Sequence, residues 1–358
     1  MEKKIKVLIV DDSALVRDIL EKGLSSDPQI EVVGKAMDVY IARDMIVNKQ
    51  PDVLTLDVEM PRMNGVEFLK RLMPQYPLPV IMVSSLTERH SRVTFEALEA
   101  GALDFVLKPS ALDKDGLKKM LIETIEKIKT AAKADVSHYK KTDFSINKIS
   151  SSAIPNRKIE KIIAIGASAG GTVATKKIIS ALPRNIPGIV VTQHMPAGFT
   201  KMYAETLQKS SDVEVREARD GDRIEMGKVL IAPGNFQMTV VKQGGSYSVE
   251  CKRSGEKVSG HCTLVDVLFH SVANNVGKNA IGVILTGMGK DGAEGLLQMK
   301  KIGARTLGQN KESCVVFGMP MEAQKLGAVE KFVDIEVMAH EIIKLVNEDE
   351  ARIASGGI

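Results

Sequence analysis

The stretch KIIAIGASAGG, residues 161–171, decides how the second half of this chain is interpreted. Its apolar residues 162–165 are typical of a short buried strand, and the glycines that follow require a tight turn before the helical pattern of TVATKKIISAL. Ser168 therefore lies in a strand-to-helix turn, at the carboxyl end of a strand, where α/β sheets build their sites. A serine there suits a nucleophile and equally suits a helix N-cap.

Two phosphate-binding interpretations of this turn fail. A P-loop requires Lys and then Ser or Thr after its last glycine, whereas Thr172 follows Gly171 directly. A dinucleotide fingerprint requires glycine where Ser168 stands. The residues GASAG do spell the G-x-S-x-G motif of α/β-hydrolases, whose catalytic residues run in the order Ser, acid, His.

Length and composition indicate a globular chain with two domains. The 358 residues are enough for two full cores, and the mean hydropathy is −0.02 with a net charge of +4. The basic residues form no stripe interleaved with aromatics, so we expect no nucleic-acid partner. The chain has 3 cysteines without paired spacing, too short an apolar N-terminal run for a signal peptide, and no membrane span, which together predict a cytoplasmic location.

Strand and helix patterns alternate along both halves, which predicts two doubly wound, mostly parallel α/β sheets. A polar segment rich in serine and lysine, residues 129–158, separates them and is expected to be a linker. A β-hairpin is predicted in MTVVKQGGSYSVEC, with Gly244-Gly245 at its turn. The predicted strands are 6–10, 31–36, 52–57, 80–85 and 104–108, then 162–166, 188–193, 228–232, 281–286 and 304–309.

Acidic and polar residues follow the strands of the first half: Asp11 and Asp12, then Asp57, Ser84 and Lys108. Any one of them could be a loop residue or a helix cap. Because the carboxyl ends of parallel strands share one edge, we expect the whole set to converge. Three carboxylates together would repel one another unless a divalent cation lay among them, and oxygen ligands suit Mg²⁺. A lysine beside them suits the stabilisation of a phosphoryl group.

These residues resemble the receiver domain of two-component response regulators. The resemblance implies that a histidine kinase phosphorylates Asp57. It implies that Asp12, Asp57 and the backbone carbonyl of Glu59 hold Mg²⁺, with Asp11 acting through water. It also implies that Ser84, Lys108 and the aromatic Phe105 respond to the phosphoryl group. The matching residues are Asp11-Asp12, Asp57, Met60-Pro61, Gly65, Ser84 and Lys108-Pro109.

A histidine and an aspartate follow two strands of the second half. His194 comes directly after the strand 188–193, and Asp291 follows the strand 281–286 within GMGKDG. A nucleophile, a histidine base and a carboxylate that orients the base form a catalytic triad. Each residue alone has an ordinary explanation, a polar loop residue for His194 and a helix N-terminal acid for Asp291. Asp266 is the first alternative to Asp291 as the orienting carboxylate.

The sequence GMGKDG also spells G-x-G-x-x-G, so a dinucleotide site is a rival interpretation. That fingerprint belongs on the first strand-to-helix turn, with an acid at the end of the next strand. Here the strand comes late in the chain, and the next predicted strand ends in Gln309.

The two halves together resemble the chemotaxis protein-glutamate methylesterases of the CheB type, in which a receiver domain precedes an esterase domain. The resemblance covers nearly the whole chain. It rests on GASAGG (166–171), QHMP (193–196), IAPGNFQM (231–238), LVDVLFHSVA (264–273), LTGMGKDG (285–292) and SCVVFGMP (313–320). It implies a flavodoxin-like receiver at 1–128, a linker at 129–158, and a Rossmann-like esterase domain with a β-hairpin at 159–350.

The same resemblance implies a phosphorylation-activated enzyme that demethylates receptor glutamates and deamidates receptor glutamines. Ser168 would be the nucleophile, His194 the base, Asp291 its orienter and the Met288 backbone N–H an oxyanion donor. The esterase half would need no cofactor, and the chain would meet membranes only through its receptors. Two departures concern the substrate pocket: Ala169 replaces a frequent Thr, and Gln237 a frequent His. The alternative is a response regulator whose second half only binds a partner.

Overall fold

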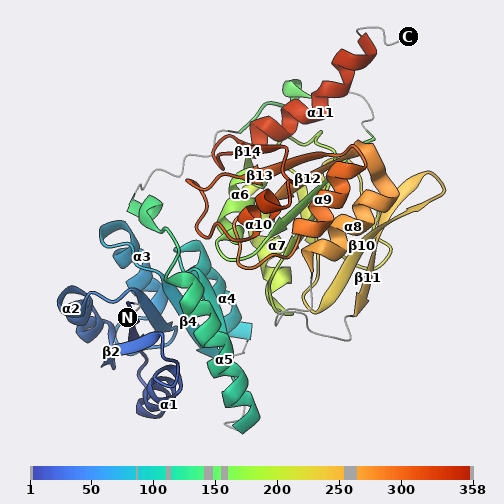
Figure 1. Cartoon of the computed structure of the whole chain (residues 1–358). Helices are drawn as coiled ribbons and strands as arrows, with labels where there is room; N and C mark the ends of the chain where they lie inside the picture. The colour runs from blue at the N-terminus through green and yellow to red at the C-terminus, as the bar shows by residue number, and fades with distance from the viewer. Residues whose placement is uncertain are drawn as a thin grey trace. The chain divides into compact units, whose positions relative to one another are not determined.

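The computed structural model describes residues 3–85, 88–109, 114–140, 148–154, 160–253 and 264–354. It divides into two compact units, Met1–Phe144 and Ser145–Ile358, which are considered separately (Figure 1). Both units are α/β, so the fold class predicted from the alternating patterns is confirmed. None of the helices within the described ranges has the length and apolar character needed to cross a membrane.

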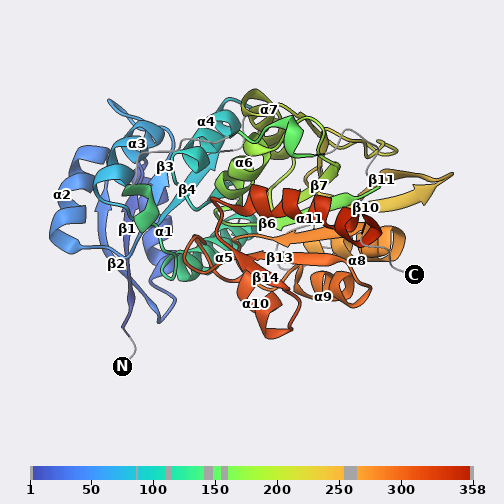
Figure 2. The same ribbon diagram turned by 90° about the horizontal axis from the view of Figure 1, so that it is seen from above.

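The first unit is built on a parallel sheet with the strand order β2-β1-β3-β4-β5. Its middle strand β3 is buried along its whole length, which explains its almost unbroken apolar sequence. Helices α1 and α5 lie on one face, and α2, α3 and α4 lie on the other (Figure 2). The elements are β1 Ile5–Val10, α1 Ala14–Leu24, β2 Ile30–Ala36, α2 Val39–Lys49, β3 Val53–Asp57, α3 Gly65–Gln75, β4 Val80–Ser85, α4 Glu88–Glu99, β5 Asp104–Lys108 and α5 Lys114–Ala131.

The second unit is built on a parallel sheet with the order β14-β13-β12-β6-β7-β9-β8. Helices α6, α7 and α11 cover one face, and α8, α9 and α10 cover the other (Figure 2). The elements are β6 Ile162–Ala167, α6 Gly171–Ala181, β7 Gly188–Gln193, α7 Phe199–Ser210, β8 Glu214–Glu217, β9 Lys228–Ile231, β10 Phe236–Gln243, β11 Ser246–Arg253, α8 Val265–Val276, η3 Gly277–Asn279, β12 Ala280–Ile284, α9 Ala293–Lys301, β13 Arg305–Gln309, α10 Met319–Lys325, β14 Lys331–Val333 and α11 Met338–Ala354.

The predicted hairpin is present as the antiparallel pair β10 and β11. Gly244 and Gly245 form its turn, with φ angles of 55° and 80°, which only glycine adopts without strain. Two strands were not predicted, β8 and β14, at the two edges of the large sheet. Both are very short, so neither has a long apolar run that the sequence could reveal.

Both described ends of the expected linker 129–158 pack against a unit. After α5, the short helix η1 Ser137–Lys140 places the buried Tyr139 against Gly101 of the first unit. The short helix η2 Ser151–Ala153 belongs to the second unit, where Asn185 Nδ2 donates to the Ser151 and Ile154 carbonyls at 3.0 Å each. Residues 141–147 and 155–158 of the expected linker lie outside the described residues.

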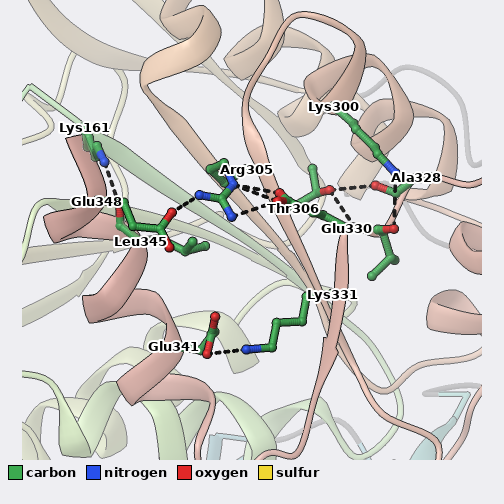
Figure 3. Close-up of polar contacts among 11 residues, drawn as sticks. Lys161, Lys300, Arg305, Thr306, Ala328, Glu330, Lys331, Glu341, Leu345 and Glu348 are labelled. Carbon is green, nitrogen blue, oxygen red and sulfur yellow. Dashed lines mark hydrogen bonds and ion pairs between the residues drawn. The ribbon is translucent and has the colours of Figure 1, made fainter. Parts of the chain in front are cut away.

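Ion pairs fasten the C-terminal helix α11 to the large sheet (Figure 3). Arg305, the first residue of β13, binds Glu330 through two nitrogens at 2.7–3.0 Å and also pairs with Glu348 of α11. Lys331 of β14 binds Glu341 of α11 at 2.7 Å. Arg305 and Lys331 are the first residues of their strands, so both cations stand at the opposite end of the sheet from the edge that carries Ser168.

Candidate active site

The turn that carries Ser168 joins β6 to α6. Ser168 is 8% exposed, and its backbone N–H donates to the Thr286 carbonyl at 3.1 Å. The N-cap of α6 is Gly170, with a φ of 75°, and it makes no side-chain capping bond. Ser168 is therefore not the helix cap, and this alternative interpretation of the serine was wrong.

Three adjacent strands of the large sheet lead to the three predicted triad residues. β6 lies between β7, which precedes His194, and β12, which leads toward Asp291. The register pairs Ala167 with Gln193, so Ser168 and His194 each come one residue after a paired position. The parallel sheet thus brings all three residues to the same edge, as the strand-end positions predicted.

His194 and Asp291 are in direct contact. Imidazole Nε2 lies 2.6 Å from Oδ2 of Asp291, and the imidazole is 7% exposed. Burial raises the pKa of Asp291. The hydrogen bond and charge of His194 lower that pKa by more than burial raises it, so it lies below its usual range. Asp291 is therefore ionised at neutral pH, and its carboxylate can accept a hydrogen bond from an Nε2–H of the imidazole.

The loop after β12 passes directly against the serine. A Cβ placed on Gly287 would lie 2.8 Å from the Ser168 Cβ and 3.1 Å from its backbone nitrogen. Gly287 is held by backbone hydrogen bonds to Val316 and from Met319. Met288, the predicted oxyanion donor, is the next residue, so its backbone N–H directly follows the glycine that packs against Ser168.

Buried polar side chains that the sequence analysis did not select support this turn. Gln193 Nε2 donates to the Ser168 carbonyl at 2.8 Å. Thr286 Oγ1 donates to the Ala169 carbonyl at 3.0 Å, and the Thr286 backbone N–H donates to Gln309 Oε1 at 2.9 Å. All three side chains are almost fully buried. The signal available in the sequence was a polar residue at or just after the end of each apolar strand.

Ala169 and Gln237, the two residues that depart from the family pattern, both make hydrogen bonds to neighbouring segments. Ala169 is nearly buried, and its carbonyl accepts the Thr286 bond described above. Gln237 Oε1 accepts the Leu264 backbone N–H at 3.1 Å, directly before α8. Leu264 is the N-cap of α8 and provides no side-chain cap, and Gln237 satisfies the backbone N–H of this N-cap residue.

The first unit gathers the predicted carboxylates at the carboxyl edge of its sheet. Oxygen atoms of Asp11, Asp12 and Asp57 lie within 4.8 Å of one another. Lys108 Nζ lies 2.8 Å from Oδ2 of Asp11 and 2.9 Å from Oδ2 of Asp57. Burial, aided by the Asp11 charge, raises the pKa of Asp57 to about 6 even though Lys108 lowers it. The single positive charge of Lys108 does not balance three carboxylates, and such a cluster of carboxylate oxygens fits a hard divalent cation.

The remaining predicted receiver residues lie on β4, on β5 and in the loop after β3. Ser84 is the second-last residue of β4 and accepts a hydrogen bond from Thr94 Oγ1 at 2.9 Å. Phe105 is buried on β5, with Lys127 Nζ 5.5 Å from its ring centre. The side chain of Glu59 is exposed in the loop between β3 and α3.

Comparison with known proteins assigns a family to each of the two units. Residues 163–342 match the family model described as CheB methylesterase, and residues 7–121 match the response regulator receiver domain. The chain belongs to the CheB methylesterase family. It is a hydrolase of the methylesterase class that carries a response regulator receiver domain.

Relatives of nearly the same length extend the match. The protein-glutamate methylesterase/protein-glutamine glutaminase of Syntrophotalea carbinolica is 56% identical over 97% of this chain and 99% of that protein. The protein of the same name from Salmonella typhimurium is 46% identical over 97% and 99%. The crystal structure of the Thermotoga maritima CheB methylesterase catalytic domain is 39% identical, with a TM-score of 0.50, and covers 52% of this chain and 98% of that one.

Proposed function

We propose that this chain hydrolyses methyl esters of glutamate side chains on chemotaxis receptors, and amides of receptor glutamines, as the adaptation step of chemotaxis signalling. The family and the names of its relatives support the substrate class. The observation that carries the mechanism is the 2.6 Å contact of His194 with Asp291, at the edge where the Ser168 turn ends. A binding module would have no need for this arrangement.

In the proposed mechanism, Ser168 Oγ attacks the ester carbonyl while Nδ1 of His194 takes its proton. The negative charge that develops on the carbonyl oxygen is stabilised by backbone donors, for which we propose Met288 N–H. Asp291 holds Nε2–H and stabilises the imidazolium. The imidazolium then protonates the leaving methoxide, and methanol departs. Water, deprotonated by His194, attacks the acyl-enzyme and releases the glutamate carboxylate and the serine.

The test is methanol release from methylated receptor membranes. Ser168→Ala should remove nearly all turnover and leave the fold intact, because the side chain provides no helix cap. A folded Ser168→Ala protein that keeps near-normal turnover would refute the nucleophile assignment. A wild-type protein that binds receptors without releasing methanol would support the alternative, a partner-binding module.

We further propose that phosphorylation of Asp57 by a chemotaxis histidine kinase activates the enzyme, with the receiver at residues 1–128. Asp12, Asp57 and the Glu59 carbonyl would hold Mg²⁺, which, when bound, neutralises part of the charge on the pocket and the phosphoryl oxygens. Asp11 would act through water, and Lys108, already within 3 Å of Asp57, would bind a phosphoryl oxygen. Ser84 and Phe105 would then repack the β4 and β5 face.

Two proteins test this regulation. Asp57→Ala should keep the basal rate and lose its response to a small phosphodonor with Mg²⁺. A fragment of residues 145–358 retains the segment that Asn185 binds, so it is the fair comparison for restraint by the receiver. A fragment faster than the unphosphorylated chain indicates that the receiver restrains the esterase. Equal rates would instead indicate that the receiver recruits the enzyme to its cytoplasmic receptor complex.

A further inference from the structure

The first turn of α8 binds the carboxylate of Asp291. The backbone N–H of Val265 donates to Oδ2 at 2.8 Å, and that of Asp266 donates to Oδ1 at 2.9 Å. Together with Nε2 of His194 on Oδ2, these donors engage both oxygens. The plane of the carboxylate, and therefore the direction from which His194 is held, is set by the position of α8 rather than by the side chain of Asp291 alone.

Asp291 itself belongs to a different segment, the loop that enters α9. It is separated from Ala293, the first residue of α9, only by Gly292 with a φ of 89°. Whether the carboxylate meets the two N–H groups of α8 therefore depends on how the first turn of α9 is placed against the first turn of α8. A tie between those two turns would fix the geometry.

Asp266 provides this tie. Its Oδ1 accepts the backbone N–H of Gly295, in the first turn of α9, at 2.7 Å. The two turns are in close contact, since a Cβ on Gly295 would lie 2.6 Å from the Phe269 Cβ and 3.2 Å from that same Oδ1. Each helix start thus binds a carboxylate from the other segment: α8 binds Asp291, and α9 binds Asp266.

We propose that Asp266 is a positioning residue of the esterase reaction, which holds α9 against α8 so that Asp291 presents Oδ2 to His194. This inference rests on the proposed Ser-His-Asp mechanism. Asp266 does not orient the histidine itself, because Nε2 of His194 is bound by Asp291. The sequence-based alternative, in which Asp266 replaces Asp291, is therefore replaced by a different role for the same carboxylate.

The energetics argue that stability alone does not account for Asp266. Burial raises its pKa, and the negative charge of Asp291 raises it further, although the N–H groups of Gly295 and Gly292 lower it. A carboxylate kept beside a second carboxylate, partly out of water, is costly to the fold. Such arrangements are typical of functional sites, where geometry has been retained at the expense of stability.

Three substitutions in the full-length protein separate placement from charge. Asp266→Ala removes the acceptor, and Asp266→Glu keeps the charge but displaces the acceptor by one methylene. Both should lower kcat by about 10–100-fold with KM within about twofold, since misplacement of a catalytic group by about 1 Å has that effect. Asp266→Asn keeps a carbonyl acceptor for Gly295 and should retain most of the wild-type kcat. Each variant is checked by urea unfolding before assay.

Asp220→Ala is the matched control. Asp220 is exposed in the segment after the edge strand β8, and it accepts the backbone N–H of Cys251 at 2.9 Å. It should leave kcat unchanged. A spectroscopic readout accompanies the kinetics: the proton on Nε2 of His194 should give a downfield NMR resonance that weakens or shifts in Asp266→Ala and Asp266→Glu and is unaltered in Asp220→Ala.

The outcomes are separable. If Asp266→Ala and Asp266→Glu fold and keep the wild-type kcat, or if Asp266→Asn loses as much as they do, the positioning role is wrong. Should Asp266→Ala fail to fold, the comparison of Asp266→Glu with Asp266→Asn decides. Asp291→Ala tests the Ser-His-Asp mechanism on which this inference rests. An unchanged kcat in Asp291→Ala would refute the proposed triad. A large loss in Asp291→Ala, with the wild-type kcat in the Asp266 variants, would refute the positioning role alone. In the Asp291→Ala background, Asp266→Ala should cause no further loss.

Discussion

Gly287→Ala should inactivate the enzyme by moving the nucleophile rather than by removing any catalytic group. The new Cβ would lie 2.8 Å from the Ser168 Cβ, whereas ordinary contact begins at 3.4 Å, so the two segments must separate by about 0.6 Å. The Met319 side chain, whose Sδ would lie 2.3 Å away, can rotate, but the Ser168 backbone nitrogen at 3.1 Å cannot. Bonds to Val316 and Met319 hold Gly287 in place, so the displacement falls on the serine turn.

The expected effect is a loss of kcat on the order of 10–100-fold, because a shift of this size moves Ser168 out of the attack geometry. The free energy of unfolding should fall by about 1–3 kcal/mol, as for other overpacked sites. The assay is initial-rate methanol release from methylated receptor membranes, normalised to the folded fraction measured by urea unfolding.

Gly282→Ala is the control in the same strand-to-helix segment. Its Cβ would meet the flexible ends of Leu296 at 2.6 Å and Met299 at 3.0 Å, so it should lower stability by a similar amount while kcat per folded molecule is retained. A Gly287→Ala enzyme with wild-type kcat would show that the loop after β12 yields instead of the serine turn. The inferred rigidity of that loop, which rests on its bonds to Val316 and Met319, would then be wrong.

Three further predictions follow from individual contacts. The loss of activity in Asp291→Asn should be roughly 10–100-fold smaller than the loss in Ser168→Ala in the same assay, since Asp291→Asn removes the charge partner and the orientation of the imidazole but leaves the nucleophile in place. An unaltered rate would contradict the triad. Arg305→Ala should loosen α11, seen as faster proteolysis near the C-terminus, because it removes contacts to Glu330 and to the helix; unchanged cleavage kinetics would show that apolar packing alone holds the helix. Burial raises the pKa of Asp222, but the hydrogen bond from Arg216 and the Arg219 backbone N–H lower it below 3.8, so this carboxylate stabilises the fold above that pH and the contribution is lost on acidification. In urea unfolding, the stability of Asp222→Asn should therefore fall less than that of the wild type between pH 5 and pH 3, and an equal fall would refute the assignment.

The elements that the sequence determined are those with a local pattern. The apolar runs of the buried strands β3 and β6, the polar stretch between the two halves, and Gly244-Gly245 at a hairpin turn each carry their own signal. The short edge strands β8 and β14 carry none, because a strand of three or four residues acquires its structure from the neighbour with which it pairs.

The candidate catalytic residues could be predicted because they stand at strand ends, and parallel strands deliver their carboxyl ends to one edge. What sequence reasoning could not assign was the choice between Asp291 and Asp266, since both lie near helix starts. Only the tertiary structure places Nε2 of His194 on Asp291 and gives Asp266 a different partner, Gly295.

The groups that orient the site are chiefly backbone N–H groups, at the first turns of α8 and α9. Every residue except proline has one, so no side-chain pattern marks those that bind a carboxylate. The buried glutamines Gln193 and Gln309 are similar: a polar residue at a strand end is visible in the sequence, but its partner is a carbonyl or an N–H on another segment. The sequence by itself thus determined which residues can perform the chemistry, and the packing of the helices on the sheet determined how they are held.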